Sequence, residues 1–293
     1  MAEFQRINEN IFYLLPSDGD GAITFVTGKN NFLIDSGSSD KVITEELAPA
    51  LRKIGYNFRN IDYVVFTHCH PETIGGAHKL REYTSNAYFL AHPKQIDKLR
   101  NPTFYAVKIY EPCADYAPPF REVRGVFVDG LISDDNIIFN DIRPIFTPGH
   151  DDDCICWYHI PTKTLISGDT VQGNGTEKTG IAFYLSLFDY RETLASLESL
   201  GISNILCSSK MKGLDSVILT PEKCRQALRY SYDITDKYDD FVRKYEYSNS
   251  KYDEKLTLPS LVSSYFEKAE RPECFGYAIL TLRQHCLKIA QHL

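Results

Sequence analysis

The chain has no long apolar run, no excess of basic residues and no internal repeat. No stretch approaches the roughly 18 consecutive apolar residues that suggest a membrane-spanning helix, so we expect no membrane association. Lysine and arginine number 32 against 39 aspartates and glutamates, which gives a net charge of −7. Because nucleic-acid binding requires a basic protein face, this balance argues against a nucleic-acid partner.

We also expect no secretory signal, because the first six residues include an acid and no apolar core. Eight cysteines in a chain without such a signal indicate free thiols in a reducing compartment, so we expect a cytoplasmic protein. At 293 residues the chain is long enough for one large domain and an appendage.

The strongest positive signal is a pair of histidines at the end of an apolar segment. Residues 63–66 are β-branched or aromatic and predict a short buried strand. His68 and His70 follow at positions i and i+2, where the strand runs into a loop. Both imidazoles can therefore turn toward one ion, and imidazole is the commonest ligand for metals such as zinc and iron.

Three other predicted strands also end on a polar side chain. Residues 32–34 lead into Asp35, residues 142–146 lead through a Pro-Gly turn to His150, and residues 164–167 lead through Gly168 to Asp169. The ordered set of Asp, His-x-His, His and Asp resembles the metallo-β-lactamase superfamily. The resemblance covers roughly residues 5–210.

The resemblance implies an α/β fold, a four-layer αβ/βα sandwich with metals at one edge. By the same resemblance, His68, His70 and His150 match the three-histidine half of the metal site. Asp169 matches the carboxylate that bridges two metals, and Asp35 matches an aspartate that supports the ligands. We expect the sandwich domain to span residues 1–215 and a helical C-terminal extension to span residues 216–293.

The sequence departs from the family pattern at the second metal position. The usual His-x-His-x-Asp-His loop here ends in Glu72 and Thr73. The last histidine of the family is missing, because a late apolar strand is followed by Cys207 and two serines. We therefore expect one tight metal, zinc by preference with iron or manganese as alternatives. The second site keeps at most Glu72 and Asp169 as ligands, so we expect it to be weak or empty. Two alternatives stay open: Glu72 is a relic of a decayed enzyme, or a Cys207 thiolate replaces the lost ligand.

These residues favour a hydrolase that cleaves an ester, lactone or thioester of a small-molecule substrate with a metal-bound hydroxide. Asp169 would orient the hydroxide, Glu72 would relay a proton to the leaving group, and Tyr184 would offer a hydroxyl to the substrate carbonyl. One alternative is a mononuclear iron oxygenase similar to the persulfide dioxygenases, with iron on His68, His150 and Asp169. Another is a binding module that kept the fold and lost turnover.

Two regions outside the motif bear on the substrate and on assembly. Residues 101–110 and 116–120 are rich in aromatic residues and proline, so they either wrap the core or form a wall of the pocket. The sequence predicts three helices near the C-terminus, at residues 222–247, in a stretch from Leu258, and at residues 277–293. By resemblance, such helical tails pack beside the active-site mouth or form a dimer contact, so a homodimer is one expectation.

Overall fold

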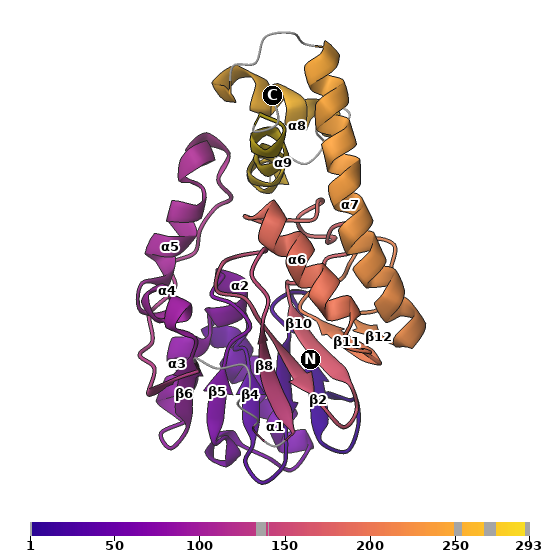
Figure 1. The fold of residues 1–293 in the computed structure, drawn as a ribbon. Helices are drawn as coiled ribbons and strands as arrows, with labels where there is room; N and C mark the ends of the chain where they lie inside the picture. Colours follow the sequence, from indigo (N-terminus) through magenta and orange to yellow (C-terminus); the bar gives the residue numbers. More distant parts are fainter. Residues whose placement is uncertain (1, 133–138, 140, 249–253, 267–273, 291–293) are drawn as a thin grey trace.

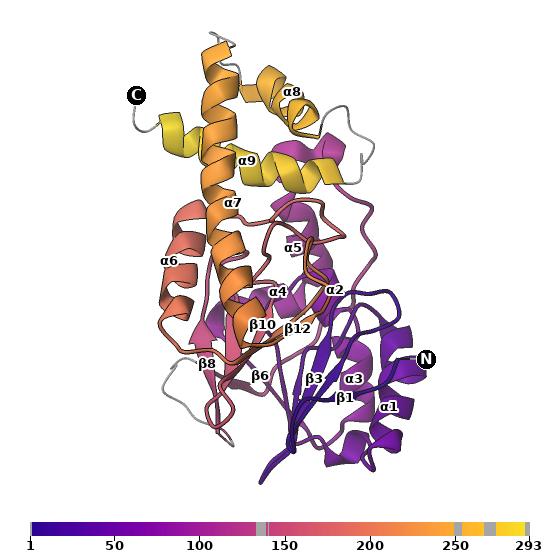
Figure 2. The same ribbon diagram turned by 90° about the vertical axis from the view of Figure 1, so that its right-hand side faces the viewer.

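The computed structural model describes residues 2–132, 139, 141–248, 254–266 and 274–290. Two β-sheets pack face to face, with helices on both outer sides (Figures 1 and 2). The strands of the first sheet, in spatial order, are β1 (Gln5–Arg6), β2 (Ile11–Leu14), β3 (Ile23–Val26), β4 (Phe32–Ile34), β5 (Tyr63–Val65), β6 (Tyr88–Ala91) and β7 (Gly130–Leu131). Those of the second are β12 (Ile218–Leu219), β11 (Asn204–Cys207), β10 (Thr164–Gly168), β9 (Ile155–His159) and β8 (Ile142–Phe146).

Helices connect the parallel strands, whereas turns and loops connect most of the others. Strands β4 to β7 run parallel to one another, as do β10 and β11, and the other pairs are antiparallel. The helices of the first half are η1 (Val42–Leu47), α1 (Ala48–Lys53), η2 (Phe58–Asn60), α2 (Pro71–Ile74), α3 (Ala77–Tyr83), η3 (Pro93–Gln95), α4 (Ile96–Arg100), α5 (Pro102–Ile109) and η4 (Glu111–Tyr116). Those of the second half are α6 (Leu187–Glu198), α7 (Pro221–Ser248), α8 (Glu254–Tyr265) and α9 (Phe275–Ala290).

The layers follow from the period-two alternation of side chains along each strand. In β5, Val64 packs in the cluster under the outer helices, whereas Val65 packs in the cluster between the sheets. In β9, Trp157 faces the other sheet, whereas Cys156 faces the opposite outer layer. Each sheet is therefore apolar on both faces and buried on both sides, and the predicted α/β sandwich is confirmed.

The predicted helical region near the C-terminus forms α7, α8 and α9. Helix α7 packs against α6, β11 and β12, and α9 packs against α7 and α8. Side chains of α7 to α9 belong to the same hydrophobic cluster as the outer face of the second sheet. The boundary after residue 215 stays a prediction, and the expected helical residues 291–293 lie outside the described residues. Within the described part of the chain, no helix combines the length and apolarity needed to cross a bilayer.

Candidate metal centre

The polar residues predicted at strand ends meet at one edge of the two sheets. His68 and His70 lie between β5 and α2, His150 follows β8, and Asp169 follows β10. A close approach of the sheets places Asp169 near the histidines: Gly168 has φ +50°, and a Cβ there would lie 2.6 Å from the side chain of Thr67. A larger residue at position 168 would push the two strand ends apart.

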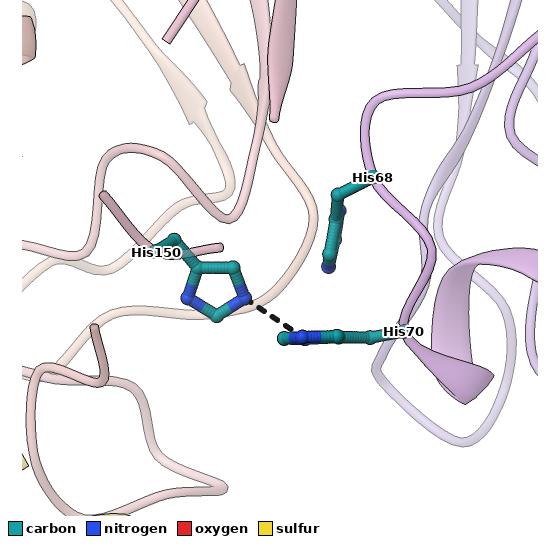
Figure 3. A group of neighbouring side chains, drawn as sticks. All are labelled: His68, His70 and His150. Carbon is teal, nitrogen blue, oxygen red and sulfur yellow. Dashed lines mark hydrogen bonds between the residues drawn. The ribbon is translucent and has the colours of Figure 1, made fainter. Parts of the chain in front are cut away.

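The three imidazoles face one another in a buried cluster (Figure 3). Nε2 of His150 lies 3.0 Å from Nδ1 of His70, and the ring centroids of all three pairs lie 4.7–5.0 Å apart. Oδ2 of Asp169 lies 3.9 Å from Nε2 of His68 and 3.8 Å from Nε2 of His150. The facing nitrogens of the three rings therefore surround a common point, with a carboxylate beside it.

The outward nitrogen of His68 is held by a chain of hydrogen bonds through Thr67 to Asp35. The backbone N–H and the hydroxyl of Thr67 donate to the carboxylate of Asp35, at 2.7 and 2.8 Å. The Thr67 oxygen is then free to accept from Nδ1 of His68, 3.1 Å away. This contact puts the His68 proton on Nδ1 and leaves the Nε2 lone pair directed at the cluster. Asp35 is thus connected to His68 through Thr67, and its role as a support for a metal ligand stays a prediction.

The other two histidines also have hydrogen-bond partners on their outer sides. Nε2 of His70 lies 3.2 Å from a carboxylate oxygen of Asp151, and Nδ1 of His150 lies 2.8 Å from both the carbonyl oxygen of Phe183 and the amide nitrogen of Gln172. With both protons on these outer nitrogens, two lone pairs face each other across the 3.0 Å between His70 and His150. Such an arrangement is repulsive unless a proton or a metal ion lies between them.

The electrostatic environment favours neutral rings on two of the three histidines. Burial lowers the pKa of His68 and of His150 below the ordinary histidine value, and the neighbouring His70 adds to both shifts. For His70, burial lowers the pKa as well, but the hydrogen bond and charge of Asp151 outweigh it, so the net shift is upward. Metal binding would displace any proton held between His70 and His150.

The donor set fits a divalent transition metal. Ligand atoms of His68, His70 and His150 lie within 4.8 Å of one another, as do those of His68, Glu72 and Asp169. The first group has three nitrogens whose outer partners fix the ring orientations, which is the arrangement of a catalytic zinc site with an open position. The second group shares His68 and is otherwise made of carboxylates, which suit a harder ion. Thr73 also faces the site, with its hydroxyl 3.4 Å from Nε2 of His68.

A large cavity opens beside the histidines. It has a volume of about 620 Å³, and His70 and Glu72 form part of its wall. Segments from several other regions of the chain complete the wall, and its aromatic side chains are Tyr110, Phe120, Phe183 and Tyr277. The segments 101–110 and 116–120 therefore contribute to the pocket, and α9 contributes Tyr277.

Two residues considered from the sequence lie elsewhere. Tyr184 is fully buried, and its hydroxyl lies 2.6 Å from Nε2 of His285 on α9, so it ties the loop to the C-terminal helices and offers no hydroxyl to the cavity. Our assignment of Tyr184 to substrate binding is therefore corrected. Cys207 is buried in the outer hydrophobic cluster, where burial raises the pKa of its thiol. Among the described residues it belongs to no group of converging metal-ligand atoms.

The sequence reasoning missed the charged residues that support His70. Lys98 on α4 lies 2.7 Å from a carboxylate oxygen of Asp151, and it also pairs with Asp152 and Asp153. Asp151 directly follows a predicted ligand, and three consecutive aspartates stand out in the sequence. That run was the available signal for Asp151, whereas nothing in the sequence pointed to Lys98.

Comparison with known proteins settles the family. A family model for the metallo-beta-lactamase superfamily matches residues 17–207, which is more than half of the chain. The chain belongs to the metallo-beta-lactamase superfamily. This metallo-beta-lactamase superfamily member is similar to the lactamase-like protein vrtG of Penicillium aethiopicum, with 29% identity over 176 residues, 60% of this chain and 46% of that protein. It is also similar to the atrochrysone carboxyl ACP thioesterase of Aspergillus fumigatus, with 29% identity over 188 residues, 62% of this chain and 48% of that protein.

The chain spans about half the length of these two relatives. Solved structures of the metallo-beta-lactamase superfamily share its fold at low sequence identity. A family member from Thermus thermophilus superposes with a TM-score of 0.69 at 15% identity, covering 99% of this chain and 93% of that one. A B3 metallo-beta-lactamase described as having an active-site glutamic acid gives a TM-score of 0.59 at 16% identity, covering 80% of this chain and 89% of that one.

The position of Asp151 leads to a first prediction for this superfamily member. Asp151→Ala should weaken metal binding about 10–100-fold, the usual effect of removing a residue that orients a ligand, because His70 loses its outer acceptor. Metal affinity can be measured by competition with a chromophoric chelator. Asp152→Ala is the matched control: Asp152 also pairs with Lys98, but only Asp151 contacts His70. Equal affinities for both variants and the wild type would contradict the role of Asp151.

Proposed function

We propose that this protein is a metal-dependent hydrolase that cleaves a thioester of a bulky apolar acyl group. The observation that carries the proposal is the position of the three converging imidazoles beside a large cavity with aromatic walls. Esters and lactones present the same kind of carbonyl and belong to the same reaction class.

His68, His70 and His150 would hold one metal ion, and zinc is the ion that this donor set favours. Bound there, the ion would act as a Lewis acid and lower the pKa of a water molecule in its open position. The outer hydrogen bonds to Thr67 and Asp151 would keep two of the rings in their binding orientation as substrate enters.

In our proposal, Asp169 and Glu72 handle the protons of the attacking water. Burial raises the pKa of Glu72, but the charges of Lys178 and His70 outweigh burial and hold the pKa below its ordinary value, so the side chain is a carboxylate at neutral pH. Asp169 orients the water by accepting a hydrogen bond, and Glu72 accepts a proton as the water oxygen bonds to the carbonyl carbon. Glu72 then returns this proton to the sulfur as the C–S bond breaks, which releases a carboxylic acid and a thiol.

The cavity supports the choice of an apolar acyl group. The aromatic side chains that line it, Tyr110, Phe120, Phe183 and Tyr277, offer flat faces for a hydrophobic or aromatic chain. One relative with 29% identity is named a thioesterase that acts on a carboxyl ACP, which favours a thioester over the other carbonyl substrates.

A substrate screen tests the proposal. Metal-replete protein should hydrolyse aryl-acyl thioesters with a higher kcat/KM than the matching oxygen esters or lactones, and short acetyl thioesters should react more slowly than aryl-acyl ones. Release of thiol can be followed with a thiol-reactive dye. Hydrolysis of none of these substrates by protein with bound metal would refute the proposal.

The two other functions considered for this fold lead to different metal contents. An iron oxygenase of the persulfide-dioxygenase type would retain iron and consume oxygen, and a binding module without turnover would retain no metal. Elemental analysis of the purified protein, together with oxygen uptake, distinguishes both from a zinc or manganese hydrolase. Cytoplasmic location and homodimer formation remain predictions from the sequence.

A further inference from the structure

A short loop near the N-terminus packs directly on the turn that carries Glu72. Gly21 has φ +62°, and a Cβ at this position would lie 1.9 Å from the backbone oxygen of Glu72. Only glycine permits so close an approach in this conformation. The preceding residue, Asp20, is consequently held at the edge of the metal centre, with 8% of its surface exposed.

A lysine from a distant part of the chain reaches the same place. The ammonium of Lys178 forms an ion pair with Asp20, and Nζ lies 3.8 Å from Oε1 of Glu72. The backbone around it is fixed at two points: the thiol of Cys274 donates to the carbonyl oxygen of Lys178 at 3.4 Å, and the N–H of Glu177 donates to the carbonyl oxygen of Lys210 at 2.9 Å. The lysine charge is therefore held at the mouth of the metal centre.

Glu72 thus lies between a potential metal site and the ammonium group of Lys178. On one side it shares a group of potential metal ligands with His68 and Asp169, and on the other it faces Lys178. The carboxylates of Asp20 and Glu72 share one ammonium group, because Lys178 forms an ion pair with Asp20 and lies 3.8 Å from Glu72. Clustered carboxylates of this kind attract a divalent cation unless another positive charge already compensates them.

We propose that Lys178 is a resident cation that replaces the second metal ion of this site. Its ammonium neutralises the carboxylates that would bind such an ion and keeps Glu72 free of metal. Lys178 is in this sense a positioning residue, because it acts through Glu72. The inference rests on the proposed metal centre, and it explains why a site that retains two carboxylates would hold one metal.

The test is a titration of zinc-loaded protein with Mn²⁺, an ion that carboxylate ligands suit. Lys178→Met should bind one additional Mn²⁺ per chain, about tenfold or more tightly than the wild type, because a full positive charge close to Glu72 has been removed. Lys178→Arg keeps the charge and should behave like the wild type. Bound Mn²⁺ can be counted from the loss of the electron paramagnetic resonance signal of the free ion.

Two further variants control the experiment. Lys210→Met removes a lysine that lines the same cavity and pairs with Glu177 at 3.0 Å, and it should not create a manganese site. Asp20→Asn combined with Lys178→Met also removes the carboxylate that pairs with Lys178 and should abolish the gain. Circular dichroism establishes that each variant is folded.

The possible failures are distinguishable. Equal binding of Mn²⁺ by the wild type and by folded Lys178→Met would overturn the inference, whatever the zinc content. Wild-type protein that retains no zinc would refute the proposed metal centre instead. The difference in Mn²⁺ binding between the wild type and the variant can be measured with or without bound zinc, because it depends on the carboxylates and on Lys178.

Discussion

His150→Ala is expected to abolish metal retention and hydrolysis together. The substitution removes one of the three candidate nitrogen ligands, and the two that remain cannot form the same site. The loss should exceed the 10–100-fold effect of removing an outer partner such as Asp151, because a direct ligand is lost. After dialysis against buffer without metal, the variant should contain close to no bound metal by elemental analysis.

His78→Ala is the matched control for this substitution. His78 lies on α3 with 37% of its side chain exposed and bonds to the carbonyl oxygen of Gly125, so it shares the residue type and not the site. It should keep its metal and its activity. A folded His150→Ala protein that holds metal as tightly as this control would contradict the three-histidine centre.

Glu72→Gln should retain the metal ion and lose turnover. The three imidazoles supply most of the metal affinity, whereas the neutral amide cannot accept the proton of the attacking water. We expect kcat to fall by about 10²–10⁴, the usual contribution of general acid–base catalysis. KM should change little, because substrate binding depends mainly on the walls of the cavity, so the effect should appear in kcat.

Two comparisons sharpen this prediction. Glu72→Asp preserves the carboxylate and should keep partial activity. Glu198→Gln makes the same change of charge on the exposed surface of α6 and should leave turnover unchanged. If Glu72→Gln turned over at the wild-type rate, Glu72 would not be the proton carrier, and the role would pass to Asp169.

The part of the site that the sequence predicted is the part that strand topology determines. Asp35, His68 and Asp169 each follow a buried strand within a few residues, and strands that run in one direction deliver their ends to one edge of a sheet. Short apolar runs followed by polar residues and glycines are visible in the sequence itself. This pattern carries the resemblance to the superfamily, and the fold and the candidate ligand positions were predicted from that resemblance.

Tyr184 shows where this reasoning stops. It follows Asp169 by only 15 positions, but the direction of its side chain depends on how α9 packs against the loop. Its hydroxyl hydrogen-bonds to His285, which lies 101 residues further along the chain. No local sequence pattern predicts such a contact. Proximity in sequence therefore suggested that Tyr184 lies near the metal, whereas the structure places it in the core.

The ion pairs around the site were missed for the same reason. Asp20 and Lys178 are 158 residues apart, and each alone looks like an ordinary charged residue in a glycine-containing loop. Their meeting depends on the close approach of Gly21 to the turn at Glu72. Charge pairs that arise from tertiary packing can be identified only in the structure, whereas the candidate ligands that they influence could be predicted from the sequence.

The most direct test of the account is the dependence of thioester hydrolysis on bound metal. Protein treated with a chelator and then dialysed should lose its activity toward the best aryl-acyl thioester of the screen. One equivalent of zinc per chain should restore it, with no further gain from a second equivalent. Full hydrolysis by protein shown to be free of metal would contradict the central claim.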